Sequence, residues 1–361
     1  MNIVKATSRY EDWLARLTPV VRSDLKVKHK EMAKSAFPFL RATFYRWVQI
    51  WPEVCPKLAR APRVLGVGDL HIENFGTWRD TEGRLVWGIN DFDETSQYPY
   101  TLDLVRLATS ALLAIREGHF AVGPKRVCDA ILGGYQKGMQ EGGRPFVLGE
   151  QHDWLRAIAE KKLRDPVQFW KKIDELGTVK GKVPKGARKA LERLLPQSGM
   201  KYRLVHRVAG LGSLGRLRFV AVADWKGGQL AREAKALLPS AIHWLSAKRP
   251  PREIFYSKIL KNAVRCRDPW VDIRGPWIVR RLSPDCSRVE LDSLAKGRSE
   301  LQLLGAMGKE TANIHLATER RRRAVLEDLR RKKPNWLVVA AEAMVQTTEK
   351  DWLAWKRGRT A

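Results

Sequence analysis

VGDLHIENFG at Val67–Gly76 and WGINDFDE at Trp87–Glu94 are the two stretches that decide the fold of this chain. A third stretch, VAGLGSLGRLRFVAV at Val208–Val222, lies far downstream. The first two contain the carboxylates and the amide that a phosphoryl-transfer site needs, and the third contains a glycine-rich loop of the kind that covers phosphates. The sequence therefore predicts the parts of one such site, written in the reverse of their usual order.

Asp69 and Asn74 are separated by four residues, which matches the spacing of a phosphoryl-transfer catalytic loop. In such a loop the Asp accepts the proton of the substrate hydroxyl and the Asn holds a magnesium ion. Asp91 opens a DFD triplet and is placed to bind the metal that bridges the phosphates, since magnesium prefers hard oxygen ligands. The competing interpretation is that these acids and amides cap turns. The presence of both loops in this order favours the metal site.

His71 lies in the first acidic loop, where it suggests either a zinc ligand or a catalytic base. No second His or Cys stands at a ligand spacing, so zinc is not favoured. We expect His71 to orient the catalytic loop through a hydrogen bond. Asp93 and Glu94 either assist the metal or lie in a turn, and the sequence leaves these two readings open.

GLGSLG fits the pattern G-x-G-x-x-G, with Gly210, Gly212, Ser213 and Gly215 as its phosphate-covering residues. A dinucleotide-binding loop would open a helix, whereas RLRFVAV after the last glycine has the composition of a strand. The pattern therefore favours a hairpin that covers phosphates in the kinase manner. A plain tight hairpin is the competing interpretation.

Lys235 is the best-placed lysine to pair with the α- and β-phosphates after such a hairpin, and Lys226 is the fallback in a KGG turn. The segment AREAKALL around Lys235 has helical rather than strand propensity. Glu253, at the start of an expected helix, is the first choice of acidic partner, and Glu233 is the second. A surface lysine is the competing interpretation for Lys235.

Hydrophobic periodicity and turn residues predict the remaining elements. Helices are expected within 1–66, including an amphipathic stretch at 34–51, and at 102–116, 125–140, 150–162 and 301–317 and from 336 onward; strands are expected at 64–67, 84–90, 202–209, 216–224 and 276–282; and an exposed basic loop is expected at 177–186.

Composition indicates a folded, non-membrane protein. The 361 residues are 44% hydrophobic with fourteen Trp, which argues against disorder, and no apolar run is long enough to span a bilayer. The N-terminal stretch lacks the apolar region of a signal peptide, so we expect a cytoplasmic protein. The four cysteines are scattered without a C-x-x-C pair and are read as buried or incidental thiols.

The formal charge of +28 is the strongest bulk signal. Such a field attracts nucleotide phosphates, nucleic acid or another polyanion. A solvated basic surface without a specific partner explains the charge equally well.

The chain resembles the aminoglycoside-phosphotransferase-like branch of the protein-kinase-like superfamily, and more closely the bacterial domain-of-unknown-function 2252 family. The resemblance covers most of the chain, and its two acidic motifs are the most specific parts. The segments that carry it are FPFLRATF (Phe37–Phe44), VGDLHIENFG, INDFDET, LDLVRLATS, RVAGLGSLG, KALLPS, IVRRL and LGAMGKETANIHLA.

This resemblance implies an α+β, two-lobed, protein-kinase-like fold that is circularly permuted, with additional helices at both ends. In relatives, a helix of the form LG-x-x-LA-x-x-H leads directly into the catalytic loop; here LGAMGKETANIHLA lies near the C-terminus, about 240 residues after that loop. The implied regions are 1–66 (N-terminal helices), 67–198 (catalytic-loop lobe), 199–283 (glycine-loop, β-rich lobe) and 284–361 (C-terminal helices and basic tail).

The resemblance also implies a function: ATP- and magnesium-dependent phosphotransfer to an unidentified hydroxyl acceptor. Asp69 would be the catalytic base, Asn74 and Asp91 the metal ligands, and Asp103 the residue that braces the catalytic loop. Val67 stands before Gly68 where many relatives carry His. Because of that departure, a catalytically inactive nucleotide binder stays an alternative, beside a basic nucleic-acid-binding or regulatory protein.

Overall fold

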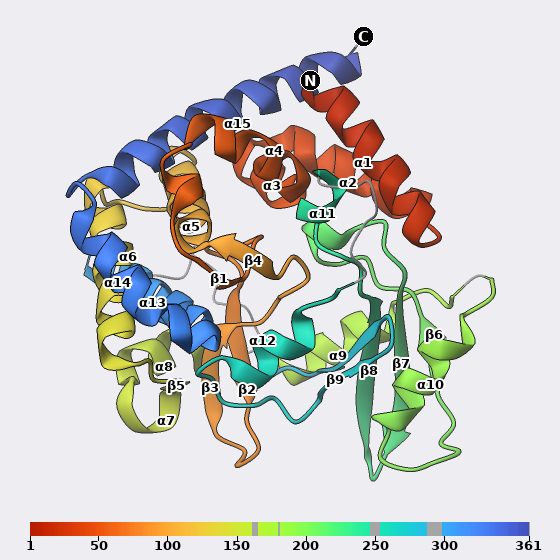
Figure 1. The fold of residues 1–361 in the computed structure, drawn as a ribbon. Coiled ribbons are helices and arrows are strands. Elements are labelled where there is room, and N and C mark those ends of the chain that lie inside the picture. Colours follow the sequence, from red (N-terminus) through yellow and green to blue (C-terminus); the bar gives the residue numbers. More distant parts are fainter. Residues whose placement is uncertain (161–164, 180, 246–252, 287–297, 361) are drawn as a thin grey trace.

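The computed structural model describes residues 1–160, 165–179, 181–245, 253–286 and 298–360. They form a mixed α+β fold with a two-stranded, a three-stranded and a five-stranded sheet (Figure 1). The helices are α1 (Ile3–Leu17), α2 (Arg22–Lys34), α3 (Ala36–Ala42), α4 (Phe44–Val54), α5 (Tyr100–Arg116), α6 (Pro124–Glu141), α7 (Leu148–Gln151), α8 (Asp153–Glu160), α9 (Pro166–Asp174), α10 (Lys185–Arg193), α11 (Ile242–Leu245), α12 (Tyr256–Asn262), α13 (Arg298–His315), α14 (Arg322–Arg331) and α15 (Trp336–Thr360), with short 3₁₀ helices η1 (Leu58–Arg60), η2 (Leu211–Ser213) and η4 (Leu316–Arg321). The strands are β1 (Arg63–Gly66), β2 (Phe75–Arg79), β3 (Leu85–Ile89), β4 (Ser96–Pro99), β5 (Phe146–Val147), β6 (Arg203–Val205), β7 (Arg218–Trp225), β8 (Gly228–Ala236), β9 (Val271–Arg274) and β10 (Trp277–Leu282).

The N-terminal region is helical, as its amphipathic pattern predicts. The stretch at 34–51 forms two helices instead of one, because Thr43 leaves the helical conformation between α3 and α4 and its hydroxyl bonds to the Phe39 carbonyl. The expected helix at 150–162 is divided between α7 and α8, and its last two residues lie outside the described part of the chain.

Two small sheets frame the first acidic motifs. β1 pairs antiparallel with β4, and β2 pairs with β3, which in turn pairs with β5. The VGDLHIEN segment therefore connects the end of β1 to the start of β2, and NDFDE follows β3 directly. The strands predicted at 64–67 and 84–90 are confirmed. The helix predicted at 102–116 is also confirmed as α5, and it is buried along almost its whole length.

The five-stranded sheet is antiparallel, with the order β6-β7-β8-β10-β9. The glycine-rich loop joins the first two strands, and Lys235 lies on the third. The helical propensity around Lys235 gave the wrong element there. β8 is flanked by β7 and β10, and its residues 231–236 are buried, so sheet pairing and burial override the propensity of alanine and glutamate.

The helices and the five-stranded sheet are stabilised by separate apolar clusters. α10 covers one face of the five-stranded sheet, where Leu191 packs with Phe219 and Val279. α9 covers the opposite face, where Phe169 packs with Val220. The largest cluster lies elsewhere and joins the N-terminal helices to α5, α6, α13 and α15. The chain ends are close together in space: α1 and α15 lie side by side in Figure 1, and a Cβ on Gly358 would lie 2.9 Å from the Val4 side chain.

α13 packs directly on α6 through glycines that let the two backbones touch. A Cβ on Gly134 would lie 1.9 Å from the Gly305 carbonyl oxygen, and one on Gly308 would lie 2.0 Å from the Ile131 carbonyl oxygen, so neither position accepts a side chain. This packing carries the end of α13 to β1, where His315 Nε2 lies 2.9 Å from Asp103 Oδ2. The prediction that LGAMGKETANIHLA packs beside the GDLHIEN loop is confirmed.

Glu310 on α13 gives the fold a pH dependence that can be measured. Its carboxylate accepts a hydrogen bond from the Ile89 amide, just before the NDFDE segment, and burial raises its pKa to about 7. The folded state therefore binds more protons than the unfolded state between pH 4.5 and 7, so stability falls as pH rises through this window. Between pH 4.5 and 7 the unfolding free energy of the unmodified protein should fall by on the order of 3 kcal/mol more than that of Glu310→Gln.

Urea unfolding at a series of pH values measures this difference. Glu175→Gln, at an exposed position, is the matched control and should leave the profile unchanged. A Glu310→Gln variant whose unfolding free energy follows that of the unmodified protein at every pH would contradict the assignment.

Candidate active site

Asp103, near the start of α5, fixes the backbone at the beginning of the first acidic loop. Its two carboxylate oxygens accept hydrogen bonds from the amides of Val67 and Gly68 at 2.7 and 2.9 Å. His315 bonds to the same carboxylate and to the Tyr135 hydroxyl on its other ring nitrogen. Asp103 therefore holds the start of the loop, as expected, and it is itself held by buried hydrogen bonds that run through His315 to Tyr135. Gly68 has φ +85°, a left-handed conformation that favours glycine at this turn.

Asp69 lines the site beneath the glycine-rich loop and is held by Arg106 from α5. Arg106 Nε donates to Asp69 Oδ1 at 3.0 Å, and Arg106 Nη2 bonds to the same oxygen and to the Leu40 carbonyl. The guanidinium is fully buried and lies over the rings of Phe44 and Trp47. Burial raises the pKa of Asp69, although Arg106 opposes the shift. The second oxygen of Asp69 points to the glycine-rich loop.

Asn74 and Asp91 lie together. Asn74 Nδ2 donates to the main-chain oxygens of Asp69 at 3.2 Å and of Asp91 at 3.4 Å. Because the amide nitrogen is used in this way, Asn74 Oδ1 is left to act as a ligand. Burial opposes ionisation of Asp91, but Lys235 and Arg280 outweigh it, so the pKa of Asp91 lies well below its usual range. Asp91 is therefore ionised throughout the physiological range.

Lys235 reaches the DFD triplet from β8. Its Nζ lies 2.7 Å from Asp93 Oδ2 and 3.4 Å from Asp91 Oδ1, and its side chain is buried. Arg216 closes the other side, at 2.7 Å from Glu94 and 3.5 Å from Asp93. Asp93 and Glu94 are both buried, and burial raises the pKa of each. The structure has both acids in a buried turn that lines the site, so they are not surface residues, and a role in metal binding stays a prediction.

The glycine-rich loop folds over these carboxylates. A Cβ on Gly212 would lie 2.9 Å from Asp69 Oδ2, so only glycine allows the backbone this close to the carboxylate. Together with Asp69, Asn74 and Asp91, the loop encloses a cavity of about 40 Å³ whose remaining lining residues include His71, Gly210, Ser213 and Arg216. Gly215 turns the chain with φ +95° and lies beside Leu25 of α2 rather than in the cavity.

α2 packs on the outside of the glycine-rich loop and holds it down. Lys28 Nζ donates to the Gly212 carbonyl at 3.1 Å, and the Val21 amide donates to the Gly215 carbonyl at 2.9 Å. Burial lowers the pKa of Lys28 to about 8. A cavity of about 40 Å³ has room for one or two waters. The loop has to lift before any larger ligand reaches Asp69.

Glu233 and Glu253, the two acids considered as partners of the lysine, lie in different places. Glu253 is exposed before α12, and the carboxylates that contact Lys235 belong to Asp91 and Asp93. Glu233 is fully buried on β8, and it pairs with three arginines, Arg207, Arg218 and Arg280. The fallback lysine, Lys226, occupies the turn between β7 and β8 with φ 47°.

The sequence analysis missed several cationic residues at or beside the site, among them Lys28, Arg106 and Arg216. A readable signal existed for Arg106, because it is the one charged residue between Asp103 and Arg116 in an otherwise apolar helical run. Lys28 and Arg216 are ordinary members of a very basic chain, so only the fold shows that they are buried against the loop.

The donor set fits a magnesium ion. Asp93 Oδ1 is buried and has no hydrogen-bond partner among the described residues, so an acceptor atom is available beside Asp91. Asp91 and Asn74 supply hard oxygens, and magnesium ordinarily takes one or two protein carboxylates and completes its shell with water and phosphate. No cluster of three or more His, Cys, Asp or Glu side chains suited to a metal occurs in the part of the chain that is described.

The described residues thus form a mixed α+β fold in which a glycine-rich loop closes over two acidic loops. A buried lysine from the third strand of the five-stranded sheet contacts Asp91 and Asp93 in the second of these loops. Residues 20–168 match the model of a family described as an uncharacterized protein conserved in bacteria (DUF2252). The match includes both acidic motifs and ends before the glycine-rich loop. No curated protein and no solved structure matches the chain. No described helix has the length and hydrophobicity needed to cross a bilayer.

Proposed function

We propose that the protein is an ATP- and magnesium-dependent phosphotransferase that acts on a hydroxyl acceptor. The observation that supports this most strongly is the position of Gly212, whose backbone lies against the carboxylate of Asp69 although more than 140 residues separate them in sequence. A glycine-rich loop, a catalytic Asp–Asn loop, a metal-binding Asp and a lysine on the third strand are the parts of a kinase-type site.

The proposal includes a circularly permuted, two-lobed, kinase-like fold. In this arrangement the five-stranded sheet with its own apolar clusters is the smaller lobe, and the helices around α5, α6 and α13 form the larger lobe. The contact between His315 and Asp103 supports the permutation, because it places the end of α13 where the catalytic loop begins. The adjacent chain ends at α1 and α15 are also compatible with it.

In the proposed reaction Asp69 accepts the proton of the acceptor hydroxyl, held in position by Arg106. The acceptor oxygen forms a bond to the γ-phosphorus as the bond to the β,γ-bridging oxygen breaks, and ADP leaves. Lys235 would contact the phosphates, and the amides of the glycine-rich loop would cover them. Asp91 and Asn74 would hold the magnesium ion, which when bound neutralises phosphate charge.

The closed loop requires one conformational step before this reaction. Lys28 and the Val21 amide must release the carbonyls of Gly212 and Gly215 so that the nucleotide can enter. Lys235 and Arg216 then exchange carboxylate partners for phosphate oxygens. Because both cations are already buried against carboxylates, their own charges need no further desolvation when phosphate oxygens replace those partners.

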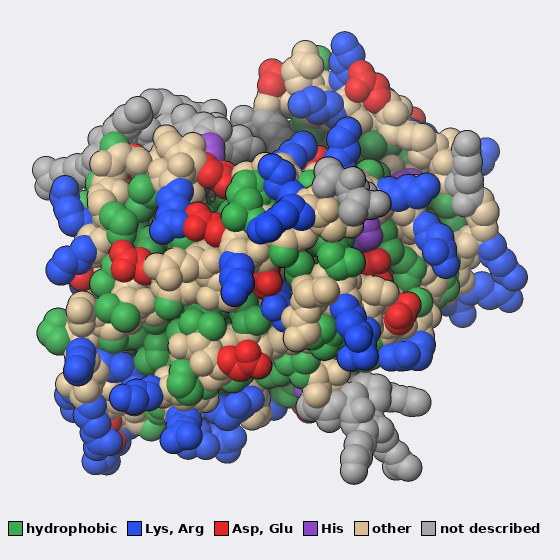
Figure 2. Space-filling model, turned by 90° about the horizontal axis from the view of Figure 1, so that it is seen from above, with side chains coloured by type: hydrophobic (Ala, Val, Ile, Leu, Met, Phe, Trp, Pro, Cys, Tyr) green, Lys and Arg blue, Asp and Glu red, His purple; other side chains and the backbone are tan. Residues whose placement is uncertain are grey.

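Surface charge supports the alternative function, a nucleic-acid-binding or regulatory protein. Figure 2 shows Lys and Arg side chains spread over one face among apolar and acidic ones, and the chain as a whole has a formal charge of +28. This pattern is not gathered into one stripe on that face. We therefore favour the phosphotransferase, which uses a specific arrangement of side chains.

ATP with magnesium is expected to raise the melting temperature by about 3–4 °C at a concentration near 100 times Kd. Asp91→Ala should remove the shift, because it removes the metal ligand, while Asp129→Ala on the exposed face of α6 should retain it. Differential scanning fluorimetry measures both. An absent shift, together with steeply salt-dependent binding of nucleic acid, would instead support the binding protein.

A further inference from the structure

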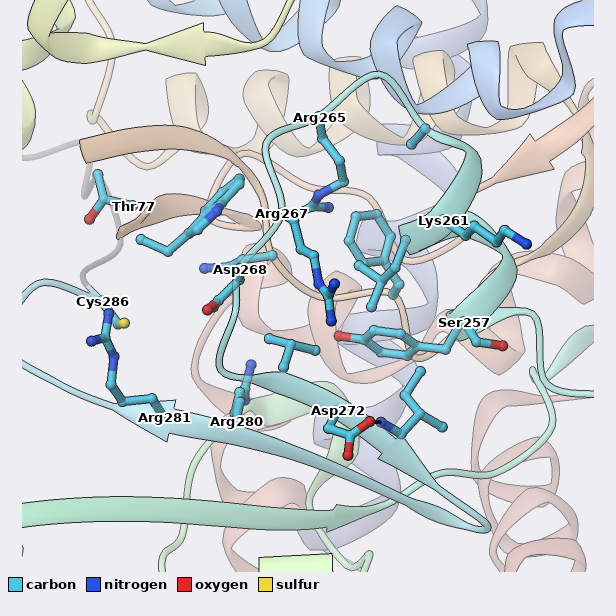
Figure 3. A pocket seen from close by; sticks show the side chains of 18 residues that line it. Thr77, Ser257, Lys261, Arg265, Arg267, Asp268, Asp272, Arg280, Arg281 and Cys286 are labelled. Carbon is cyan, nitrogen blue, oxygen red and sulfur yellow. Dashed lines mark hydrogen bonds between the residues drawn. The ribbon is translucent and has the colours of Figure 1, made fainter. Parts of the chain in front are cut away.

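A cavity of about 540 Å³ lies beside the DFD triplet, and its lining residues do not include those of the glycine-rich loop. Its walls come from α12, the segment after α12, β2, and the pair β9–β10 (Figure 3). Asn90 and Phe92, the two neighbours of Asp91, face it, but Asp69 does not line it. Its volume is in the range of small-molecule sites.

The lining of this cavity is cationic. Arg265, Arg267, Arg280 and Arg281 extend toward it from the segment after α12 and from β10, and Lys261 lies at its edge, against two acids, Asp268 and Asp272 (Figure 3). Asp272 is already used, because its oxygens accept from Arg274 and from the Ile273 amide. Burial raises the pKa of Asp268, which works against its serving as a full counter-charge.

Arg281 is the cation with unmet hydrogen-bonding capacity. Its Nε and Nη2 atoms are buried and have no hydrogen-bond partner among the described residues. Arg281 on β10 pairs directly with Arg232 on the neighbouring strand β8, and both guanidinium groups lie over the ring of Trp270. Burial and Arg281 together lower the pKa of Arg232 to about 10. The adjacent Cys286 thiol brings no negative charge, because burial raises its pKa.

Two like charges opposite each other and two unsatisfied donors are unfavourable in a protein without a ligand. An anionic oxygen pair would satisfy both donors at once, since a guanidinium binds carboxylate or phosphate in a bidentate manner. Aromatic rings complete the cavity: Trp78 and Phe92 line it with Arg265 stacked over both, and Tyr256 lies edge-on to Phe92.

We propose that this cavity binds a small ligand that joins a planar ring to a phosphate or carboxylate, with Arg281 holding the anionic group. The ring would lie against Trp78, Phe92 and Tyr256. Two sources supply this chemistry: the nucleotide of the phosphotransfer reaction, or a separate small molecule. The proposal stands without the phosphotransfer, because it rests on Arg281 and the cavity and not on Asp69 or Asp91.

Isothermal titration of the full-length protein with phenyl phosphate tests the proposal. We expect a Kd below about 1 mM, and at least about tenfold weaker binding of inorganic phosphate and of phenol, which lack the ring and the charge respectively. Arg281→Gln should weaken phenyl phosphate binding at least about tenfold, while Arg126→Gln on the exposed face of α6 leaves it unchanged.

Folding controls separate binding from structure. Arg281→Gln relieves the repulsion with Arg232, so its melting temperature should equal or exceed that of the unmodified protein, and Asp91→Ala should leave phenyl phosphate binding intact. Competition by saturating ATP with magnesium identifies the nucleotide as the occupant, and additive binding identifies a separate ligand; both outcomes support the pocket. No binding of phenyl phosphate, or equal binding by Arg281→Gln, overturns it.

Discussion

An Asp69→Asn variant should bind ATP and magnesium as tightly as the unmodified protein and should transfer phosphate about 10³-fold more slowly. The substitution keeps the shape of the side chain and an oxygen that accepts from Arg106 Nε, so the loop stays in place. It removes the group that takes the proton from the acceptor hydroxyl. Burial raises the pKa of Asp69, which makes this carboxylate a better proton acceptor than an ordinary exposed aspartate.

The release of ADP from ATP, with water as the acceptor, measures this effect without knowledge of the natural substrate. Asp129→Asn, on an exposed helix face, is the matched control and should keep the full rate. If Asp69→Asn releases ADP at the rate of the unmodified protein, Asp69 is not the base, whatever the nucleotide affinity.

Arg106→Met should lower the unfolding free energy by about 3–5 kcal/mol, the largest stability effect we expect from a single substitution in the site. The guanidinium is fully buried and contacts four groups at once: the Asp69 carboxylate, the Leu40 carbonyl and the faces of Phe44 and Trp47. Its loss leaves the Asp69 carboxylate without its ion-pair partner from α5, in a site where burial already raises its pKa. Chemical denaturation at neutral pH measures the loss.

The double variant Asp69→Asn/Arg106→Met tests the cause of that loss. If the cost comes from stranding a charge, adding Asp69→Asn should restore part of the stability, so the two substitutions will not be additive. Strict additivity would contradict an energetic coupling between Asp69 and Arg106 and would assign the loss to packing against Phe44 and Trp47.

Local patterns were sufficient to predict most of the elements. The short runs of strand-forming residues at β3 and β10 and the apolar run of α5 depend on neighbours in sequence, and those predictions are confirmed. The helical propensity of AREAKALL gave the wrong element, because β8 is a central strand that pairs on one side with β7, across a tight turn, and on the other with β10 from a later part of the chain. Its environment, not its composition, determines its conformation.

The sequence predicted those residues of the candidate site whose intervals along the chain match a known motif. Asp69, Asn74 and Asp91 follow from short intervals in two adjacent loops, and Asp103 and the end of α13 follow from the family resemblance. The groups that close the site were not predictable in this way. Lys28 holds the Gly212 carbonyl and Arg216 pairs with Asp93 and Glu94, and in a chain of 67 Lys and Arg residues nothing local distinguishes those that are buried.

A crystal structure of the protein with magnesium and a non-hydrolysable ATP analogue tests the central claim most directly. The proposed function predicts a metal ion about 2.0–2.1 Å from oxygens of Asp91 and Asn74 and the γ-phosphate beneath a lifted glycine-rich loop, next to Asp69. A nucleotide bound away from these three residues, with the loop still closed on Asp69, would contradict it.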